Sequence, residues 1–239
     1  ASLPDFVVRP RPQDPEPQPV PADAPIFRTM DAIRTALEVE LETDARVFVA
    51  GIDVAAGGNV FGIMPGLHDR FGVGSSDRGL AIGQQHDARR RDLAVLVGRQ
   101  LAVGRGLGVG AAIAGMRPVV EVMYLDFLGV CFDQLLNQAA KLPYMTGGGA
   151  QMGLTVRTQF GAGRSSGSQH SQSLEALLAH IPGLTVVMPS TPADAYGLLR
   201  ASIQDPNPVV FIENRLLYGK KGPQPPADLD QPRVPDLPP

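Results

Sequence analysis

Short apolar runs alternate with helical patterns along most of the chain. Residues 46–50, 118–124, 154–158, 184–188 and 209–213 are each rich in apolar or β-branched side chains and long enough for one strand. The segments between several of these runs repeat their apolar residues at helical spacing instead. Strands that alternate with helices predict an α/β fold, with a parallel sheet covered by helices on both faces.

Two helices are marked by their apolar faces. Leu37 lies four residues from both Ile33 and Leu41, so these residues mark one face of a first helix, after folding begins near Thr29. Asp126 is placed to cap a second helix, which the glycine run at 147–149 ends. The apolar residues of that second helix are Phe127, Val130, Cys131, Leu135 and Leu136.

Two further helices continue the alternation of strands and helices. The segment 173–180 predicts a short one. At Thr191 a capping residue is followed by Pro192 at the first helical position and by Asp194 at the third, and we expect this helix to reach Ile203.

Composition and charge narrow the class of protein. The 239 residues are 44% hydrophobic, enough for one sizeable domain, and the net charge of -3 gives no reason to expect nucleic acid or an anionic membrane as partner. No apolar run reaches the ~18 residues of a membrane span. Cys131 is the single cysteine, so no internal disulfide can form, and its apolar surroundings predict a buried thiol. We expect a cytoplasmic protein.

The chain divides into a domain and two proline-rich ends. Residues 1–25 predict a linker or disordered tail, residues 26–222 the α/β domain, and residues 223–239 a second disordered tail. Within the domain, residues 71–106 are atypical because they are arginine-rich and poorly periodic. This segment is either an insertion or an out-of-frame translation of a GC-rich gene.

Several residues could carry chemistry, and each has a simpler explanation. His170 follows a loop rich in glycine and serine, and is either a surface or capping histidine or a proton donor or anion contact. Tyr124 ends a predicted strand, and is either a core aromatic or a flat surface for a heteroaromatic ring. Asp205 and Asn207 are turn residues whose oxygens could also bind a cation.

The glycines near residue 106 allow two interpretations. Gly106, Gly108 and Ala111 loosely match a dinucleotide-binding fingerprint, which would make the chain a nicotinamide-binding domain. A glycine-lined helix that packs closely explains the same residues. The sequence holds no zinc-type cluster of histidine and cysteine, no Walker loop and no G-x-S-x-G motif.

From Met30 to about Gly222 the chain resembles the beta subunit of the thiamine-diphosphate-dependent component of 2-oxoacid dehydrogenases. The motifs that carry the resemblance are RPVVEVMYLDF, DQLLNQAAKLPYM, LTVRTQFGAG, QHSQSLEALLAHIPGLTVVMPSTPADAYGLL and DPNPVVFIE. DFLGVCFDQLLNQAAK and LYGKKG are most similar to forms in which alpha and beta units are fused. In such a form, residues 1–25 would be the linker between the units.

The resemblance implies a transketolase-like pyrimidine-binding domain with the thiamine-diphosphate-binding fold. The complete enzyme would decarboxylate a 2-oxoacid of the pyruvate or branched-chain type, with acetoin also open as substrate, and transfer the acyl group to lipoyl-lysine. The implied partners are an alpha unit that mainly holds Mg²⁺ and the diphosphate, a second alpha-beta pair, and a lipoyl-bearing acyltransferase.

The resemblance also implies roles for single residues. Tyr124 would stack on the aminopyrimidine ring of thiamine diphosphate. His170 would face the substrate and assist the reductive acylation of the lipoyl group. The residues implied for a monovalent cation such as K⁺ are Asp205 and Asn207, with backbone oxygens from around Leu154, Thr155 and Ser202.

Two departures from the family stand beside these expectations. The family carries a Thr-Pro-Ile-Ser-Glu type of motif, and its glutamate hydrogen-bonds the pyrimidine ring and activates it. Counting back from Gly110, the expected position falls near Gln100 and Leu101, and neither side chain can relay a proton as a carboxylate does. The family also continues into a C-terminal domain that this sequence lacks. A catalytically inactive remnant is therefore the alternative to an active beta-type unit.

Overall fold

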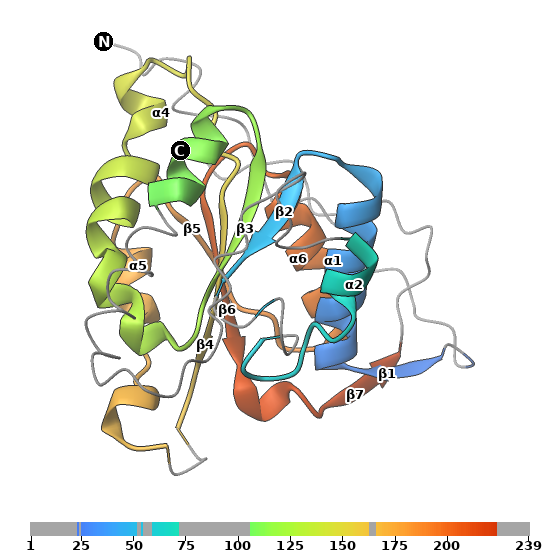
Figure 1. Cartoon of the computed structure of the whole chain (residues 1–239). Coiled ribbons are helices and arrows are strands. Elements are labelled where there is room, and N and C mark those ends of the chain that lie inside the picture. Colours follow the sequence, from blue (N-terminus) through green and yellow to red (C-terminus); the bar gives the residue numbers. More distant parts are fainter. Residues whose placement is uncertain are drawn as a thin grey trace, which may run out of the picture.

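A parallel sheet forms the centre of the computed structural model (Figure 1), which describes residues 23, 25–51, 54, 59–71, 106–162 and 166–223. Five strands of this part of the chain lie in the order β2-β3-β4-β6-β5. Each is buried along most of its length, as expected for a sheet covered on both faces. The strands are β2 (Val47–Ala50), β3 (Arg117–Val122), β4 (Thr155–Phe160), β5 (Thr185–Val187) and β6 (Val209–Asn214).

One face of the sheet is covered by α1 (Thr29–Thr43), α2 (Leu67–Phe71) and α6 (Pro192–Gln204). Ile33 and Leu37 of α1 are fully buried, which confirms the predicted apolar face of this helix. The start of α6 is also as predicted. The Thr191 hydroxyl accepts a hydrogen bond from the Asp194 amide at 3.1 Å, and the Asp194 carboxylate accepts one from the Thr191 amide.

The other face carries shorter and less regular helices, together with a helix at residues 106–113. The 3-10 helix η1 (Leu125–Cys131) leads into the π-helix η2 (Gln134–Ala139) and then into α4 (Leu142–Met145). The short helix α5 (Glu175–Ala179) completes this layer (Figure 1). Helices on both faces confirm the predicted fold class, and Cys131 is buried and free, as predicted.

The prediction of one helix capped by Asp126 was wrong. The helical turns begin at Leu125, directly after Tyr124, and they change type along their length. The Asp126 carboxylate instead accepts hydrogen bonds from the amide and side chain of Gln172, at 3.1 and 2.9 Å. A long-range partner has taken the side chain that local spacing assigned to the helix end.

A small antiparallel ribbon closes the described domain. β1 (Ile26–Arg28) pairs with β7 (Lys221–Pro223), and Ile26 lies opposite Pro223. Pro223 therefore belongs to a strand and not to the tail predicted from residue 223 onward. Residues 1–22, 24 and 224–239 lie outside the described residues, so the predictions of two disordered ends stay predictions. No helix in the described ranges is long and apolar enough to cross a membrane.

Close packing on the sheet explains the glycine at position 108 of the helix at residues 106–113. A Cβ atom at Gly108 would lie 2.7 Å from Cγ2 of Val120 on β3 and 3.4 Å from Cδ1 of Leu154. The glycine therefore allows close packing of the helix on the sheet, one of the two interpretations of the sequence. Gly110 in the same helix has no atom within 4 Å of its Cβ position.

These two glycines give a matched test of the packing. We expect Gly108→Ala to lower the free energy of unfolding by about 1–3 kcal/mol, because the added methyl group has no room against Val120. Gly110→Ala should be neutral or should raise it by up to about 1 kcal/mol, because alanine favours a helix. Urea unfolding of both variants measures the difference, and equal effects would contradict the close packing.

Candidate functional site

The carboxyl ends of the central strands bring Tyr124 and His170 together. Tyr124 lies just beyond β3, and His170 ends the 3-10 helix η3 (Ser168–His170), which follows β4. Their rings meet edge to face, with centroids 4.6 Å apart and planes at 87°. Phe127 contacts the same imidazole at 5.2 Å, and Phe61 contacts the Tyr124 ring at 5.3 Å. Two residues that the sequence singled out separately thus share one aromatic cluster.

Tyr124 adopts a backbone conformation that residues other than glycine rarely adopt. Its φ is 66° and its ψ is 129°, so it lies in the region that favours glycine. The Tyr124 amide donates to Oε1 of Gln159 at 3.3 Å, and its hydroxyl accepts from Nη1 of Arg215 at 2.9 Å. A strained residue of this kind persists only where its surroundings fix it, and such residues concentrate at functional sites.

Arg215 is a site residue that the sequence analysis missed. It opens the 3-10 helix η4 (Arg215–Leu217), directly after β6, and is 4% exposed. Besides Tyr124, its guanidinium donates to the carbonyl oxygens of Gly161 at 3.1 Å and His170 at 3.4 Å. It also lies over the Tyr124 ring, 4.6 Å from the centroid. The only signal in the sequence is a basic residue just after a buried strand.

The segment that carries His170 is fixed by one long-range contact and one local turn. Asp126 of η1 holds it through the two hydrogen bonds from Gln172 described above. On the other side the Ser171 hydroxyl donates to the carbonyl oxygen of Gly167 at 2.8 Å. Gly167 itself has a φ of 80°, which only glycine adopts without strain. His170 therefore lies in a locally closed turn, which Gln172 ties to η1.

A buried charge cluster lies within the same sheet. Arg157 on β4 is fully buried and donates to Glu213 on β6 at 2.7 Å and to Glu121 on β3 at 3.4 Å. The Asn59 amide donates to Glu121 at 2.6 Å, and the Tyr218 hydroxyl donates to Glu213 at 2.7 Å. These contacts explain how three neighbouring strands can each bury a charged side chain.

Burial sets the protonation of Glu121. Removal from water raises the pKa of this carboxyl from 4.5 to about 7, although the Arg157 cation opposes the change. The nearby Glu213 carboxylate acts in the same direction as burial. Glu121 can therefore carry a proton at neutral pH.

The residues implied for a monovalent cation lie together at the opposite, amino-terminal edge of the sheet. The Thr155 hydroxyl donates to the carbonyl oxygen of Ser202 at 2.9 Å, and the Leu154 carbonyl accepts from the Val209 amide at 2.9 Å. Oδ1 of Asp205 accepts from the amide and side chain of Asn207, at 2.7 and 3.1 Å. The turn role expected from the sequence is thus present, and several of the oxygens that would bind a cation also accept hydrogen bonds within the chain.

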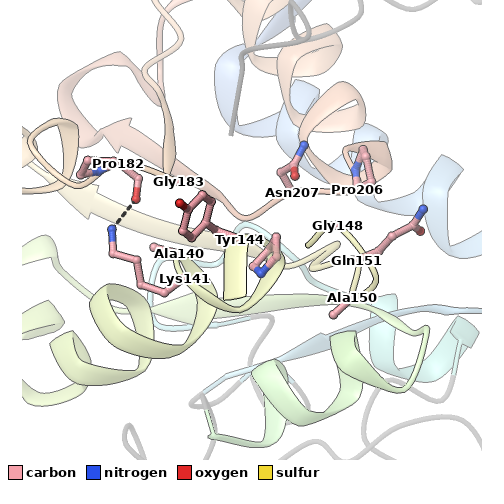
Figure 2. A pocket seen from close by; sticks show the side chains of 11 residues that line it. Ala140, Lys141, Tyr144, Gly148, Ala150, Gln151, Pro182, Gly183, Pro206 and Asn207 are labelled. Atoms are coloured by element: carbon pink, nitrogen blue, oxygen red, sulfur yellow. Dashed lines mark hydrogen bonds between the residues drawn. The ribbon is translucent and has the colours of Figure 1, made fainter. Parts of the chain in front are cut away.

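A cavity of about 400 Å³ lies at this amino-terminal edge, between η2 and α4 on one side and the segments that precede β4, β5 and β6 on the other (Figure 2). Asn207 lines it, as does Lys141, which donates to the carbonyl oxygen of Pro182 at 2.7 Å. The other lining residues are Ala140, Pro143, Tyr144, Gly148, Ala150, Gln151, Pro182, Gly183 and Pro206. Neither Tyr124 nor His170 borders this cavity.

Part of the site discussed from the sequence lies outside the described residues. Gln100 and Leu101, the positions at which the family's activating glutamate is missing, lie outside the described residues, as does most of the atypical segment 71–106. Within the described residues, no group of three histidine, cysteine, aspartate or glutamate side chains is arranged to hold a metal ion.

The family is shown by comparison with known proteins. Residues 27–221 match the family described as transketolase, pyrimidine binding domain, and this chain belongs to it. The described sheet, with helices on both faces and with Tyr124 and His170 at its carboxyl edge, lies within that match.

Individual relatives place the chain near the beta subunits of 2-oxoacid dehydrogenases. It is 40% identical over 211 residues to the beta subunit of acetoin:2,6-dichlorophenolindophenol oxidoreductase from Bacillus subtilis (strain 168), covering 83% of this chain and 56% of that protein. It is 38% identical over 203 residues to the beta subunit of 2-oxoisovalerate dehydrogenase from the same organism, covering 85% and 57%. The chain thus spans about half the length of the curated relatives it matches.

A solved structure supports the same fold. The chain is similar to a structure titled split gene transketolase, inactive beta4 tetramer, with a TM-score of 0.55 and 15% sequence identity. The similarity covers 79% of this chain and 52% of that one. At this identity the likeness concerns the fold alone.

The pKa of Glu121 predicts how stability depends on pH. Between pH 4.5 and about 7 the folded chain binds the Glu121 proton more tightly than the unfolded chain, so this group's stabilising contribution is lost as the pH rises through that window. Glu121→Gln keeps the shape of the protonated form and removes the titration. The unfolding free energy of the variant minus that of the unmodified chain should therefore increase by on the order of 2–3 kcal/mol as the pH rises from 4.5 to 8.

Urea unfolding across this pH range measures the difference between the two proteins. The matched control is Glu38→Gln on α1, whose carboxylate is partly exposed and forms a surface ion pair with Arg34. The part of the Glu121→Gln curve that this surface control does not share reports on Glu121. A flat curve for Glu121→Gln would contradict a proton bound at Glu121.

Proposed function

We propose that this chain is the pyrimidine-binding part of a beta-type unit of a thiamine-diphosphate-dependent 2-oxoacid dehydrogenase. The observation that carries the proposal is the contact of the Tyr124 and His170 rings at the carboxyl edge of the sheet, in a chain of the pyrimidine-binding family. Ligands of open α/β sheets bind outside the carboxyl ends of the strands. The names of the two beta subunits described above suggest acetoin and a branched-chain 2-oxoacid as substrates. A further similar protein, 39% identical over 191 residues, is named pyruvate dehydrogenase E1 component subunit beta and suggests pyruvate.

The residues at this edge fit part of what the cofactor requires. An aromatic ring at Tyr124 suits the aminopyrimidine, and the imidazole of His170 can donate or accept a proton beside it. A carboxylate for the pyrimidine nitrogen is the missing element. Among the described residues, Glu121 and Glu213 are buried in contact with Arg157 and are not available for that role.

In the assembled enzyme, Tyr124 would orient the aminopyrimidine, and His170 would assist acyl transfer to the lipoyl group of an acyltransferase. Thiamine diphosphate, held with Mg²⁺ mainly by an alpha unit, separate or fused, would supply the carbanion chemistry of the decarboxylation. A dimer of alpha-beta pairs in the cytoplasm completes the proposal. The missing glutamate favours a second candidate, a non-catalytic unit that pairs with an alpha unit and binds the cofactor without turnover.

Single-turnover decarboxylation separates these two candidates. The chain would be mixed with an alpha unit, thiamine diphosphate, Mg²⁺ and, in turn, pyruvate or a branched-chain 2-oxoacid. Acetoin has no carboxyl group to lose, so for this substrate the release of acetaldehyde by carbon–carbon bond cleavage is measured instead. If the proton relay is the only missing part, we expect Gln100→Glu to raise the rate by about 10²-fold or more. In that background, His170→Ala should lower acyl transfer to lipoyl-lysine more than decarboxylation.

Cofactor binding provides the control for this experiment. Binding of thiamine diphosphate by both proteins, with no turnover in either, would favour the non-catalytic unit. If neither protein binds the cofactor in the presence of an alpha unit, the proposed function is wrong.

We also propose that a K⁺ ion binds near Asp205 and Asn207, with backbone oxygens of Leu154, Thr155 and Ser202. The hydrogen bonds among these residues support the proposal, because they gather oxygen atoms at one place. The melting temperature should then be higher in KCl than in tetramethylammonium chloride of equal ionic strength, and Asn207→Ala should remove the difference. The exposed control Asn137→Ala should retain it, and a chain that responds equally to both salts would refute the site.

A further inference from the structure

Arg215 touches three separate segments of the candidate site. We propose that it is a positioning residue, whose guanidinium holds the Tyr124 ring and the His170 segment in one arrangement. The proposal rests on the proposed function as far as catalysis is concerned, since Tyr124 and His170 act there by that proposal. The geometric part of the inference stands on the contacts alone.

The hydrogen bonds of Arg215 use the shape of its guanidinium. Nη1 donates to the Tyr124 hydroxyl at 2.9 Å, while Nη2 donates to the carbonyl oxygens of Gly161 and His170 at 3.1 and 3.4 Å. The three acceptors belong to the segment after β3, the end of β4 and the end of η3. A planar fork of donors can reach all three at once, whereas a lysine ammonium is a single point of charge.

Arg215 differs from the other buried arginines of the described residues in the groups that surround its charge. Arg157 contacts Glu121 and Glu213, and Arg200 contacts Glu40 at 2.8 Å. No ion pair within the described residues includes Arg215, and its Nε is buried without a partner among them. Instead its guanidinium lies over the Tyr124 ring at 4.6 Å and over the Phe61 ring at 6.0 Å.

This difference argues against a purely structural role. A buried cation without a carboxylate contributes poorly to stability, because its loss of hydration is only partly compensated. A chain that needed Arg215 for packing alone would do as well with an apolar side chain of similar size. The arginine does bring one thing that such a side chain cannot, a fixed direction for Tyr124 and for the His170 carbonyl.

The conformation of Tyr124 is strained, so its position depends on contacts such as the one with Arg215. Its positive φ is unfavourable. Its carbonyl oxygen accepts only a local bond, from the Phe127 amide at 3.1 Å, whereas the amide contact with Gln159 and the hydroxyl contact with Arg215 connect it to other segments. Without Arg215, the ring can leave the edge-to-face contact with His170, and the segment that carries His170 loses one of its anchors. A displacement of about 1 Å at a reacting group lowers rates by about 10²-fold.

The first test follows the ring contact by NMR in the full chain. The unmodified protein should show cross-relaxation between the Tyr124 and His170 ring protons, since the centroids are 4.6 Å apart. Arg215→Met should lose this signal. Arg215→Lys keeps the charge but not the planar fork of donors, and the signal should be weaker in this variant. If the methionine variant does not fold, the lysine variant is measured in its place.

Arg200→Met is the matched control. Arg200 is likewise a buried arginine that hydrogen-bonds a tyrosine hydroxyl, at 3.1 Å to Tyr196, and lies over the ring of that tyrosine. It belongs to α6, however, which covers one face of the sheet. This variant should lower the melting temperature and leave the Tyr124–His170 signal in place. Retention of the signal in both methionine variants would overturn the proposal, whatever the activity of the chain.

The second test separates positioning from substrate binding. With an alpha unit, thiamine diphosphate, Mg²⁺ and the 2-oxoacid that turns over fastest, Arg215→Met should lower kcat for acyl transfer by about 10–100-fold and change KM less than about threefold. Arg200→Met should change neither. An unchanged kcat in Arg215→Met would refute the catalytic part, while a lost ring contact in a chain without any turnover would uphold the positioning and count against the proposed function.

Discussion

Arg157 lies fully buried in the middle strand of the sheet and contacts a glutamate on each neighbouring strand. It faces Glu121 directly in the register of β3 and β4, and Glu213 of β6 completes the arrangement at 2.7 Å. Removal of the arginine would leave two carboxyl groups buried without their shared cation, a change that typically costs about 3–5 kcal/mol. The relative positions of the three strands, and of everything at their carboxyl ends, depend on this group.

The charge cluster and the aromatic cluster are connected through Gln159. Its side chain donates to Glu121 at 3.5 Å and accepts from the Tyr124 amide at 3.3 Å. Tyr124 in turn contacts Arg215, which holds the carbonyl of His170. A continuous set of polar contacts therefore leads from the interior of the sheet to the ring that would face a substrate, and the strained backbone of Tyr124 lies in its middle.

The sequence predicted those features that depend on short stretches of chain. Strand positions followed from apolar runs, and the start of α6 followed from Thr191, Pro192 and Asp194, because a capping box is a local interaction. Contacts between distant residues were not predictable in this way. Asp126 binds Gln172 instead of capping a helix, and Arg215 has no local pattern that points to Tyr124. Local patterns singled out His170 and Tyr124, and the resemblance to a family gave them specific roles, but neither pointed to the arginine that joins them.

The ribbon of β1 and β7 has a mechanical consequence. Ile26 is paired with Pro223, so the chain enters and leaves the described domain at adjacent points and in opposite directions. A force that pulls these two points apart acts on the outermost residue pair of the ribbon. The hydrogen bonds of the ribbon would then break one after another from that end. The load would reach the parallel sheet only after the ribbon had opened, so the ribbon can yield to tension between attached segments while the carboxyl edge keeps its shape.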